Sequence, residues 1–191
     1  MTRSEWVSRG QRGLRGALAA AGLAAALLTA MPVASVSAAP QAAPGSVMIE
    51  SVFHGYVLCA SKDDESVYLR PIDTTNKYCK WQQIMSPSGA FLLYNAAKDQ
   101  VMAYPNGGDG GAVVMEDAQT TGDGNIPNTE LWSWGGEEDW GASALQSFAD
   151  SGQNVDAKNP NGDGPRKDAV HTRGWRHGNQ RELTWNAIPA R

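Results

Sequence analysis

Side chains that can bind a polar, uncharged ligand gather near the end of the chain. Asp156 supplies a carboxylate and Trp175 an aromatic ring, and Asn179 and Gln180 follow as adjacent amides. A carboxylate accepts hydroxyl protons, an amide donates and accepts hydrogen bonds, and a ring stacks on C–H groups. Together these groups are complementary to the hydroxyl groups and the C–H face of a sugar. Taken singly, Asp156 is also typical of a turn, and the amide pair of a polar loop.

Patterns for other chemistry are weaker. The segment NPNGDG at 159–164 imitates the start of a calcium loop, but Val170 stands at the twelfth position, where a bidentate glutamate is needed. The three histidines have no zinc spacing, and the sequence contains no Gly-x-Ser-x-Gly elbow or phosphate-binding loop. The sequence therefore singles out no catalytic centre, metal site or cofactor.

The N-terminal segment has the pattern of an export signal. Four arginines precede an uncharged run from Ala17 to Ala30, and the small residues needed for cleavage end at Ala38. We predict a secretory signal peptide over 1–38, a flexible leader over 39–46 and one domain over 47–191. An uncleaved membrane anchor is the alternative, but the run of fourteen residues is shorter than the roughly 20 of a spanning helix.

Export would change both the net charge and the state of the cysteines. The chain carries −4, and loss of 1–38 removes four of 16 basic and one of 20 acidic residues, which leaves −7. An acidic chain without a basic stripe is unsuited to nucleic acid or an anionic membrane. In an oxidising compartment the simplest interpretation of Cys59 and Cys79 is a disulfide, which would close a loop of about 20 residues and contribute about 3 kcal/mol. Free thiols and metal ligands are the alternatives.

Short strands that could carry the polar residues recur three times along the chain. The expected strands are 47–49, 57–60 and 67–69, then 91–94, 101–104 and 113–115, then 144–148, 154–157 and 169–172. Similar turns, PNGGDG at 105–110 and PNGDG at 160–164, follow the second strand of the last two units. Each unit closes at a tryptophan, and Trp81, Trp132 and Trp185 are 51 and 53 residues apart. No long 3.6-residue apolar period is present, so we predict an all-β fold.

Three four-stranded units with a closing tryptophan resemble a β-trefoil, and the pattern is most similar to the ricin B-chain-like lectins, or family 13 carbohydrate-binding modules. The resemblance covers about 47–188. It implies pseudo-threefold symmetry, with repeats over about 47–86, 87–139 and 140–191, and buried closing tryptophans. The repeat does not use Trp134, Trp140 and Trp175, and each is either additional core or an exposed platform.

The resemblance also implies one sugar site, in the third unit. Family sites combine an aspartate after the second strand, a ring further on and an Asn-Gln pair near the closing tryptophan. The ring would be Trp175 or His171, and His177 could also face the sugar. The implied carbohydrate-binding residues are Asp156, His171, Trp175, His177, Asn179 and Gln180.

The sequence departs from the family pattern in two ways. The units close with CKW, ELW and LTW, so the Gln-x-Trp signature is absent, and Trp185 follows Gln180 by five residues where the family has two. At the place of Asp156 we align Met102 in the second unit and Cys59, or in another register Ser61, in the first. Neither of these units carries the carboxylate.

These patterns predict a secreted, monomeric β-trefoil that binds carbohydrate without changing it. The resemblance implies a galactose-type sugar or a polysaccharide as ligand, and no cofactor. An alternative is a secreted β-trefoil that binds protein, such as a protease inhibitor, with the loop 117–130 as its exposed segment. A small hydrolase with an unrecognised site is a third possibility.

Overall fold

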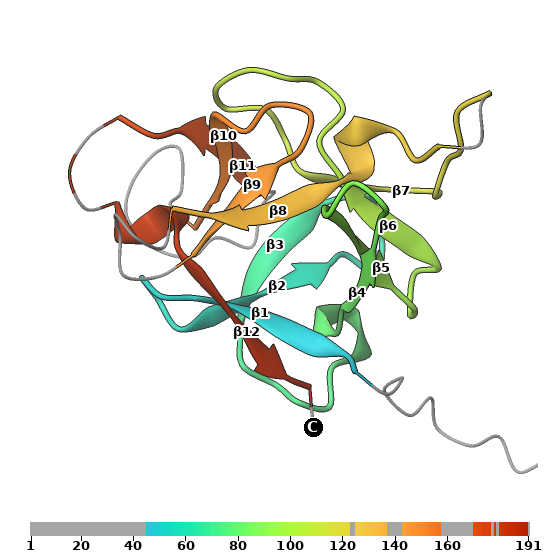
Figure 1. The fold of residues 1–191 in the computed structure, drawn as a ribbon. Coiled ribbons are helices and arrows are strands. Elements are labelled where there is room, and N and C mark those ends of the chain that lie inside the picture. The colour runs from blue at the N-terminus through green and yellow to red at the C-terminus, as the bar shows by residue number, and fades with distance from the viewer. Residues whose placement is uncertain are drawn as a thin grey trace, which may run out of the picture. The chain divides into compact units, whose positions relative to one another are not determined.

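The computed structural model describes residues 45–122, 125–136, 143–157, 170–176, 178 and 180–190. The chain divides into two units, Met1–Ser37 and Ala38–Arg191, and the described residues all belong to the second. They form the strands β1–β12 (Figure 1). The strands are β1 (Val47–Ser51), β2 (Tyr56–Ala60), β3 (Val67–Pro71), β4 (Gln82–Met85), β5 (Phe91–Asn95), β6 (Gln100–Ala103), β7 (Val114–Glu116), β8 (Trp132–Gly135), β9 (Ala144–Ser147), β10 (Gln153–Asp156), β11 (His171–Gly174) and β12 (Trp185–Pro189).

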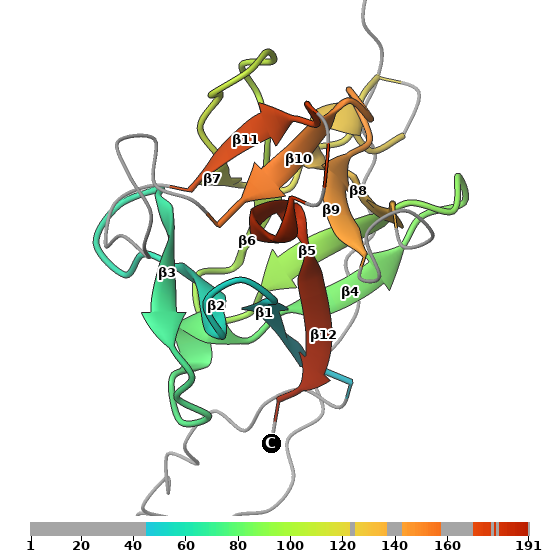
Figure 2. The same ribbon diagram turned by 90° about the vertical axis from the view of Figure 1, so that its left-hand side faces the viewer.

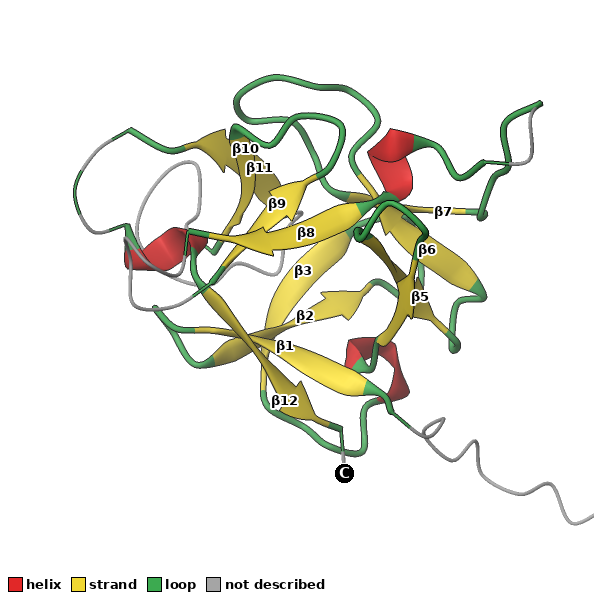
Figure 3. Ribbon diagram, viewed as in Figure 1, coloured by secondary structure: helices red, strands yellow, loops and turns green. Residues whose placement is uncertain are grey.

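The strands repeat in three units of four, β1–β4, β5–β8 and β9–β12. A 3-10 helix precedes the fourth strand of each unit (Figure 3): η1 (Lys77–Cys79), η2 (Asn128–Glu130) and η3 (Arg181–Leu183). The all-β prediction is confirmed. Among the residues that the structure describes, no helix is long and apolar enough to cross a membrane.

The first and fourth strands of the units form a closed ring. β12 pairs with β1, β4 with β5 and β8 with β9, all antiparallel. Single backbone pairs link these three strand pairs, and they join Val47 to Trp81, Phe91 to Trp132 and Ala144 to Thr184. Each of the six strands thus has a neighbour on both sides, which covers edges that would otherwise be open.

The second and third strands of each unit form a hairpin, which gives the three hairpins β2–β3, β6–β7 and β10–β11. Their third strands meet around one point, because Val113 N donates to Val170 O over 2.9 Å and Val170 N donates to Val67 O over 2.6 Å. Figure 2 shows β10 and β11 of the third unit as neighbouring strands at this end of the fold. The three valines are buried and equivalent, one from each unit. The third unit is therefore placed against the second by direct backbone contacts.

The closing tryptophans hold the core together in the same way in all three units. Trp81, Trp132 and Trp185 are 0–1% exposed, as predicted. Each indole N–H donates to a main-chain carbonyl of the second strand of its own unit. The bonds are Trp81 to Leu58 at 2.9 Å, Trp132 to Met102 at 2.8 Å and Trp185 to Val155 at 2.9 Å. A buried indole needs such a partner, so its position along the second strand is fixed.

These bonds correct one alignment made from the sequence. Met102 is equivalent to Val155, and the equivalent of Asp156 is Ala103 in the second unit. The alignment of Asp156 with Met102 was therefore wrong by one residue, while that with Cys59 was correct. Because successive side chains of a strand face opposite ways, a shift of one residue exchanges a core position for an outward one.

The predicted disulfide is confirmed. Cys59 and Cys79 are bonded, with their Cα atoms 4.0 Å apart, and they join β2 to η1. Both are fully buried beside Met48 and Val57. The first unit thus carries a covalent link at the position where the third unit carries Asp156.

The tryptophans left over from the repeat take different positions. Trp134 is partly buried against the core and lies 5.6 Å from Phe91, between ring centroids. Trp175 is 50% exposed. Trp140 lies outside the described residues. Trp175 is therefore the spare tryptophan available to a ligand in the described part of the chain.

Candidate functional site

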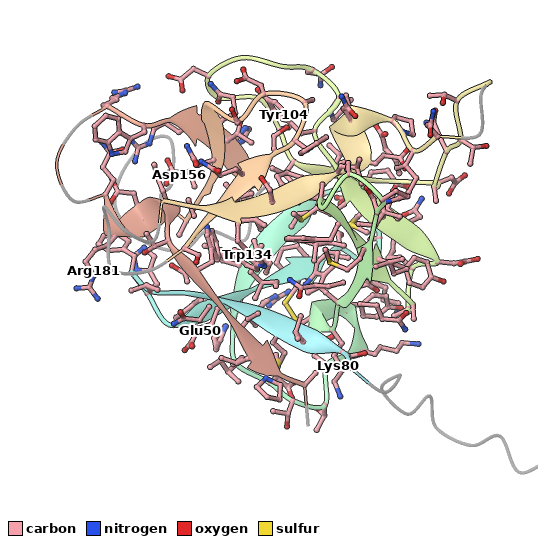
Figure 4. The ribbon with its side chains drawn as sticks, in the orientation of Figure 1. Glu50, Lys80, Tyr104, Trp134, Asp156 and Arg181 are labelled. Atoms are coloured by element: carbon pink, nitrogen blue, oxygen red, sulfur yellow. A yellow bond between two sulfur atoms is a disulfide. The ribbon has the colours of Figure 1, made fainter. Side chains whose placement is uncertain are left out.

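The β10–β11 hairpin carries the candidate residues on one face. Asp156 is the cross-strand partner of His171, and Asn154 that of Arg173. The alternate residues Val155 and Thr172 face the core and are buried. Since side chains alternate along a strand, Asp156 (labelled in Figure 4) and the residues His171 and Arg173 of the partner strand point to the opposite side of the hairpin.

Arg173 connects these residues to the segment before Trp185. Its Nε donates to Asp156 Oδ2 over 2.8 Å, and its Nη1 donates to Gln180 Oε1 over 3.1 Å. Its Nη2 donates to Glu182 Oε1 over 2.7 Å. The three charged side chains are only 10–17% exposed. One guanidinium thus holds two carboxylates and an amide in fixed positions, and we call this set the Arg173 network.

The Arg173 network is charged although it is largely removed from water. Burial by itself lowers the pKa of Arg173, but the bonds and charges of Asp156 and Glu182 outweigh burial and raise that pKa above its ordinary value. The guanidinium therefore stays protonated and carries one positive charge against two carboxylates. Within the described ranges, no three His, Cys, Asp or Glu side chains lie close enough together to hold a metal ion.

Trp175 follows directly on this network. Strand β11 ends at Gly174, and the half-exposed indole comes next. Gln180 Oε1, besides binding Arg173, lies 3.4 Å from the backbone N of Arg176 as its acceptor. The same amide therefore contacts Arg173, two residues before Trp175, and Arg176, one residue after it.

His171 is the other candidate ring. Its Nδ1 lies 3.0 Å from the carbonyl oxygen of Gly110, in the loop that follows β6 of the second unit. The histidine is less exposed than Trp175. His171 therefore contacts the neighbouring repeat, whereas Trp175 offers the more accessible aromatic surface.

Four of the six residues implied by the resemblance lie around the Arg173 network. Asp156 and Gln180 bind Arg173 directly, His171 lies opposite Asp156, and Trp175 follows two residues after Arg173. The remaining two, His177 and Asn179, lie outside the described residues.

The corresponding faces of the other two units carry different chemistry. In the first unit, Cys59 occupies the position of Asp156 and pairs with Tyr68, and Arg70 occupies the position of Arg173. In the second unit, Ala103 occupies the position of Asp156 and Glu116 that of Arg173. Arg70 lies over the Tyr68 ring, 4.9 Å from its centroid. In the part of the chain that the structure describes, the third hairpin alone combines a second-strand carboxylate with a third-strand arginine.

Arg173 and Glu182 were not recognised from the sequence. Arg173 could have been found from the hairpin register, because it lies two residues from His171 and therefore shares its face. Glu182 gave no comparable signal, because its position depends on how η3 folds back on the hairpin.

Comparison with protein-family models and with curated proteins finds no match. Solved structures do match. The ricin B-like lectin of Macrolepiota procera, solved in complex with lactose, is similar with a TM-score of 0.58 and 19% identity, over 78% of this chain and 99% of that one. A designed protein with threefold symmetry is similar with a TM-score of 0.60 and 18% identity, over 76% of this chain and 99% of that one.

A third similar structure is an enzyme. The GlcNAcα1-4Gal-releasing endo-β-galactosidase of Clostridium perfringens is similar with a TM-score of 0.59 and 15% identity over 75% of this chain. The present chain spans about a third of that enzyme, 32% of its length. At such identities the likenesses concern the fold, and the chemistry must be argued from the site.

Proposed function

We propose that this chain, which has the β-trefoil fold of the ricin B-like lectins, binds carbohydrate at one site in its third repeat. The observation that carries the proposal is the Arg173 network, which joins Asp156 and Gln180 through an arginine that precedes the half-exposed Trp175 by two residues. The likeness to a lectin solved with lactose supports a galactose-type ligand. A polysaccharide that contains such a sugar would present the same groups.

The groups of this site suit a pyranose ring. A carboxylate offers about four lone-pair positions, so Asp156 can accept from sugar hydroxyls in addition to Arg173. Trp175 offers an aromatic face for the C–H side of the sugar. The ion pair holds Asp156 in one orientation before any ligand arrives, which reduces the entropy lost on binding.

Binding without catalysis is the activity that this geometry favours. Asp156 and Glu182 both accept hydrogen bonds from one guanidinium. A glycosidase needs two carboxyl groups on either side of a scissile bond, one of them able to donate a proton. Two carboxylates that accept from the same arginine are suited to hold a ligand and not to transfer a proton to it.

Replacing Asp156 by asparagine tests the proposed site. The amide keeps the shape of the side chain and can still accept from Arg173, but the charge-assisted acceptor for sugar hydroxyls is lost, which costs about 1.5–3 kcal/mol. Affinity for the best ligand of a glycan array should fall at least roughly tenfold by isothermal titration. Asp117→Asn is the charge-matched control, because Asp117 is exposed in the second repeat and accepts from Gln100.

Equal binding by Asp156→Asn and the parent would refute the site. Trp175→Ala should weaken binding by up to about tenfold, the value of one aromatic contact.

A protease-inhibition panel run beside the array tests the protein-binding alternative. A protein that inhibits a protease and binds no glycan would replace the carbohydrate proposal.

We also propose that the protein is secreted and acts as a monomer. The basic, apolar and small-residue series ahead of Ala39 supports export. N-terminal sequencing of protein from the culture medium should begin at Ala39. Protein that keeps Met1 in the membrane fraction would refute the cleavage.

A further inference from the structure

The loop after β6 belongs to the second repeat but packs on the third. Gly110 N donates to Thr172 O over 2.9 Å, and Thr172 N donates to Gly111 O over 2.9 Å. Gly107, Gly108 and Gly110 have φ angles of 62°, 79° and 79°, which favour glycine. The sequence PNGGDG thus allows a tight loop that reaches strand β11.

Tyr104 fixes the shape of this loop from inside. The tyrosine is 1% exposed, and its hydroxyl donates to the carbonyl oxygen of Gly108. Its ring lies so near Gly111 that a Cβ atom there would come within 2.5 Å of Tyr104 Cε2. Figure 4 shows Tyr104 on the side of the fold that also carries Asp156. The loop therefore has a defined position relative to the β10–β11 hairpin.

Asp109, in this loop, contacts the residues on both sides of Trp175. Its Oδ1 accepts from Gly174 N over 2.5 Å, and its Oδ2 accepts from Arg176 Nη2 over 3.2 Å. The bond from Gly174 and the charge of Arg176 lower the pKa of Asp109 against the opposing effect of burial. The carboxylate is therefore ionised at neutral pH, when both contacts are strongest.

Trp175 lies just beyond the end of regular structure. Strand β11 ends one residue before it, and its neighbours are anchored by Asp109 and by Gln180. The more an exposed ring moves in the free protein, the more it must be ordered when a ligand stacks on it, which weakens binding. Anchors on the residues beside the ring reduce that cost.

We propose that Asp109 is a positioning residue for the sugar site, and that it holds the Trp175 platform from the neighbouring repeat. The proposal rests on the function proposed above. The site is then composite, with hydrogen-bonding groups from the third repeat and the aromatic platform oriented by the second. Asp109 itself acts through Trp175 and does not contact the sugar.

A double-mutant cycle tests this role. Asp109→Ala should weaken binding of the best array glycan by roughly three- to tenfold in isothermal titration, because the ring must be ordered on binding. In a Trp175→Ala background the same change should alter affinity less than about twofold, since there is no ring to position. Asp117→Ala removes the same charge from the second repeat and should leave affinity unchanged.

A second variant guards against misfolding. Arg176→Ala removes one of the two contacts of Asp109 and keeps the bond from Gly174. It should weaken binding by less than Asp109→Ala does, again only when Trp175 is present. Parent-like affinity of both Asp109→Ala and Arg176→Ala, or a loss of full size in the Trp175→Ala background, would overturn the proposal.

The free protein provides a readout that needs no ligand. In ¹⁵N NMR relaxation, the indole N–H of Trp175 should have a lower order parameter in Asp109→Ala than in the parent or in Asp117→Ala. If the parent binds no glycan, the proposed function fails and this measurement decides the role of Asp109. An order parameter that stays unchanged overturns that role.

Discussion

Replacing Arg173 by Met should destabilise the protein more than any comparable change of a surface arginine. The substitution removes three hydrogen bonds of 2.7–3.1 Å and takes the shared cation away from Asp156 and Glu182. Breaking a buried ion pair from one side costs about 3–5 kcal/mol. Because the charged side chains keep 10–17% exposure, we expect the lower end, about 3 kcal/mol.

Urea unfolding followed by tryptophan fluorescence measures this cost. For a domain of this size about 3 kcal/mol corresponds to a fall in Tm of roughly 6–12 °C. Arg70→Met is the matched control, because Arg70 occupies the equivalent place in the first repeat and contacts the Tyr68 ring. That contact is worth about 0.5–1 kcal/mol. Similar losses for the two variants would refute the reasoning.

Removing the two carboxylate charges as well should restore stability. If the cost arises from carboxylates that have lost their cation, adding Asp156→Asn and Glu182→Gln to Arg173→Met should recover most of it, since neutral amides are far cheaper to bury. A triple variant as unstable as Arg173→Met would show that the arginine acts through packing of its aliphatic chain.

Three further predictions concern the core, the disulfide and a buried acid. Trp185→Ala should lower the free energy of unfolding in urea by about 3–5 kcal/mol. Trp185→Phe should recover only part of this stability, because the Val155 carbonyl still lacks its donor. Full recovery of stability by Phe would contradict the role of that bond. Non-reducing peptide mapping should show the Cys59–Cys79 link. Reduction of this disulfide should lower the free energy of unfolding by about 3 kcal/mol. An unchanged urea midpoint after reduction would argue against this contribution. Burial raises the pKa of Glu130, so ionised Glu130 destabilises the folded state at a pH above that pKa. Glu130→Gln should therefore stabilise the protein most at pH values of about 8, and progressively less as the pH falls through the raised pKa. A gain in stability that is the same at every pH would contradict this sign.

The repeat could be predicted from the sequence because it depends on residues with a strong physical requirement. Trp81, Trp132 and Trp185 each need a large buried space, so their spacing reports the period of the fold even without the Gln-x-Trp signature. Register was harder to assign. Val101 and Met102 are both apolar, so the sequence does not show which of them corresponds to Val155, whereas the indole bond to Met102 does.

The charge partners of the candidate site could not be predicted in the same way. Asp156 looks like an available acceptor in the sequence, but its orientation depends on Arg173, seventeen residues later on the opposite strand. Asp109 and Gly174 are 65 residues apart and belong to different repeats. Contacts of this kind arise from the threefold packing of the hairpins, and no local pattern reports them.

The indole bonds also separate two kinds of position within each repeat. The residue whose carbonyl binds the tryptophan faces the core, where Leu58, Met102 and Val155 are all apolar. The next residue faces the other way and is a half-cystine, an alanine or an aspartate in the three copies. Mutations at this second position leave the tryptophan anchors in place, so the copies are free to diverge there. A triplicated scaffold of this design can specialise one copy for a ligand while another copy provides a covalent link, and selection on either task leaves the shared architecture intact.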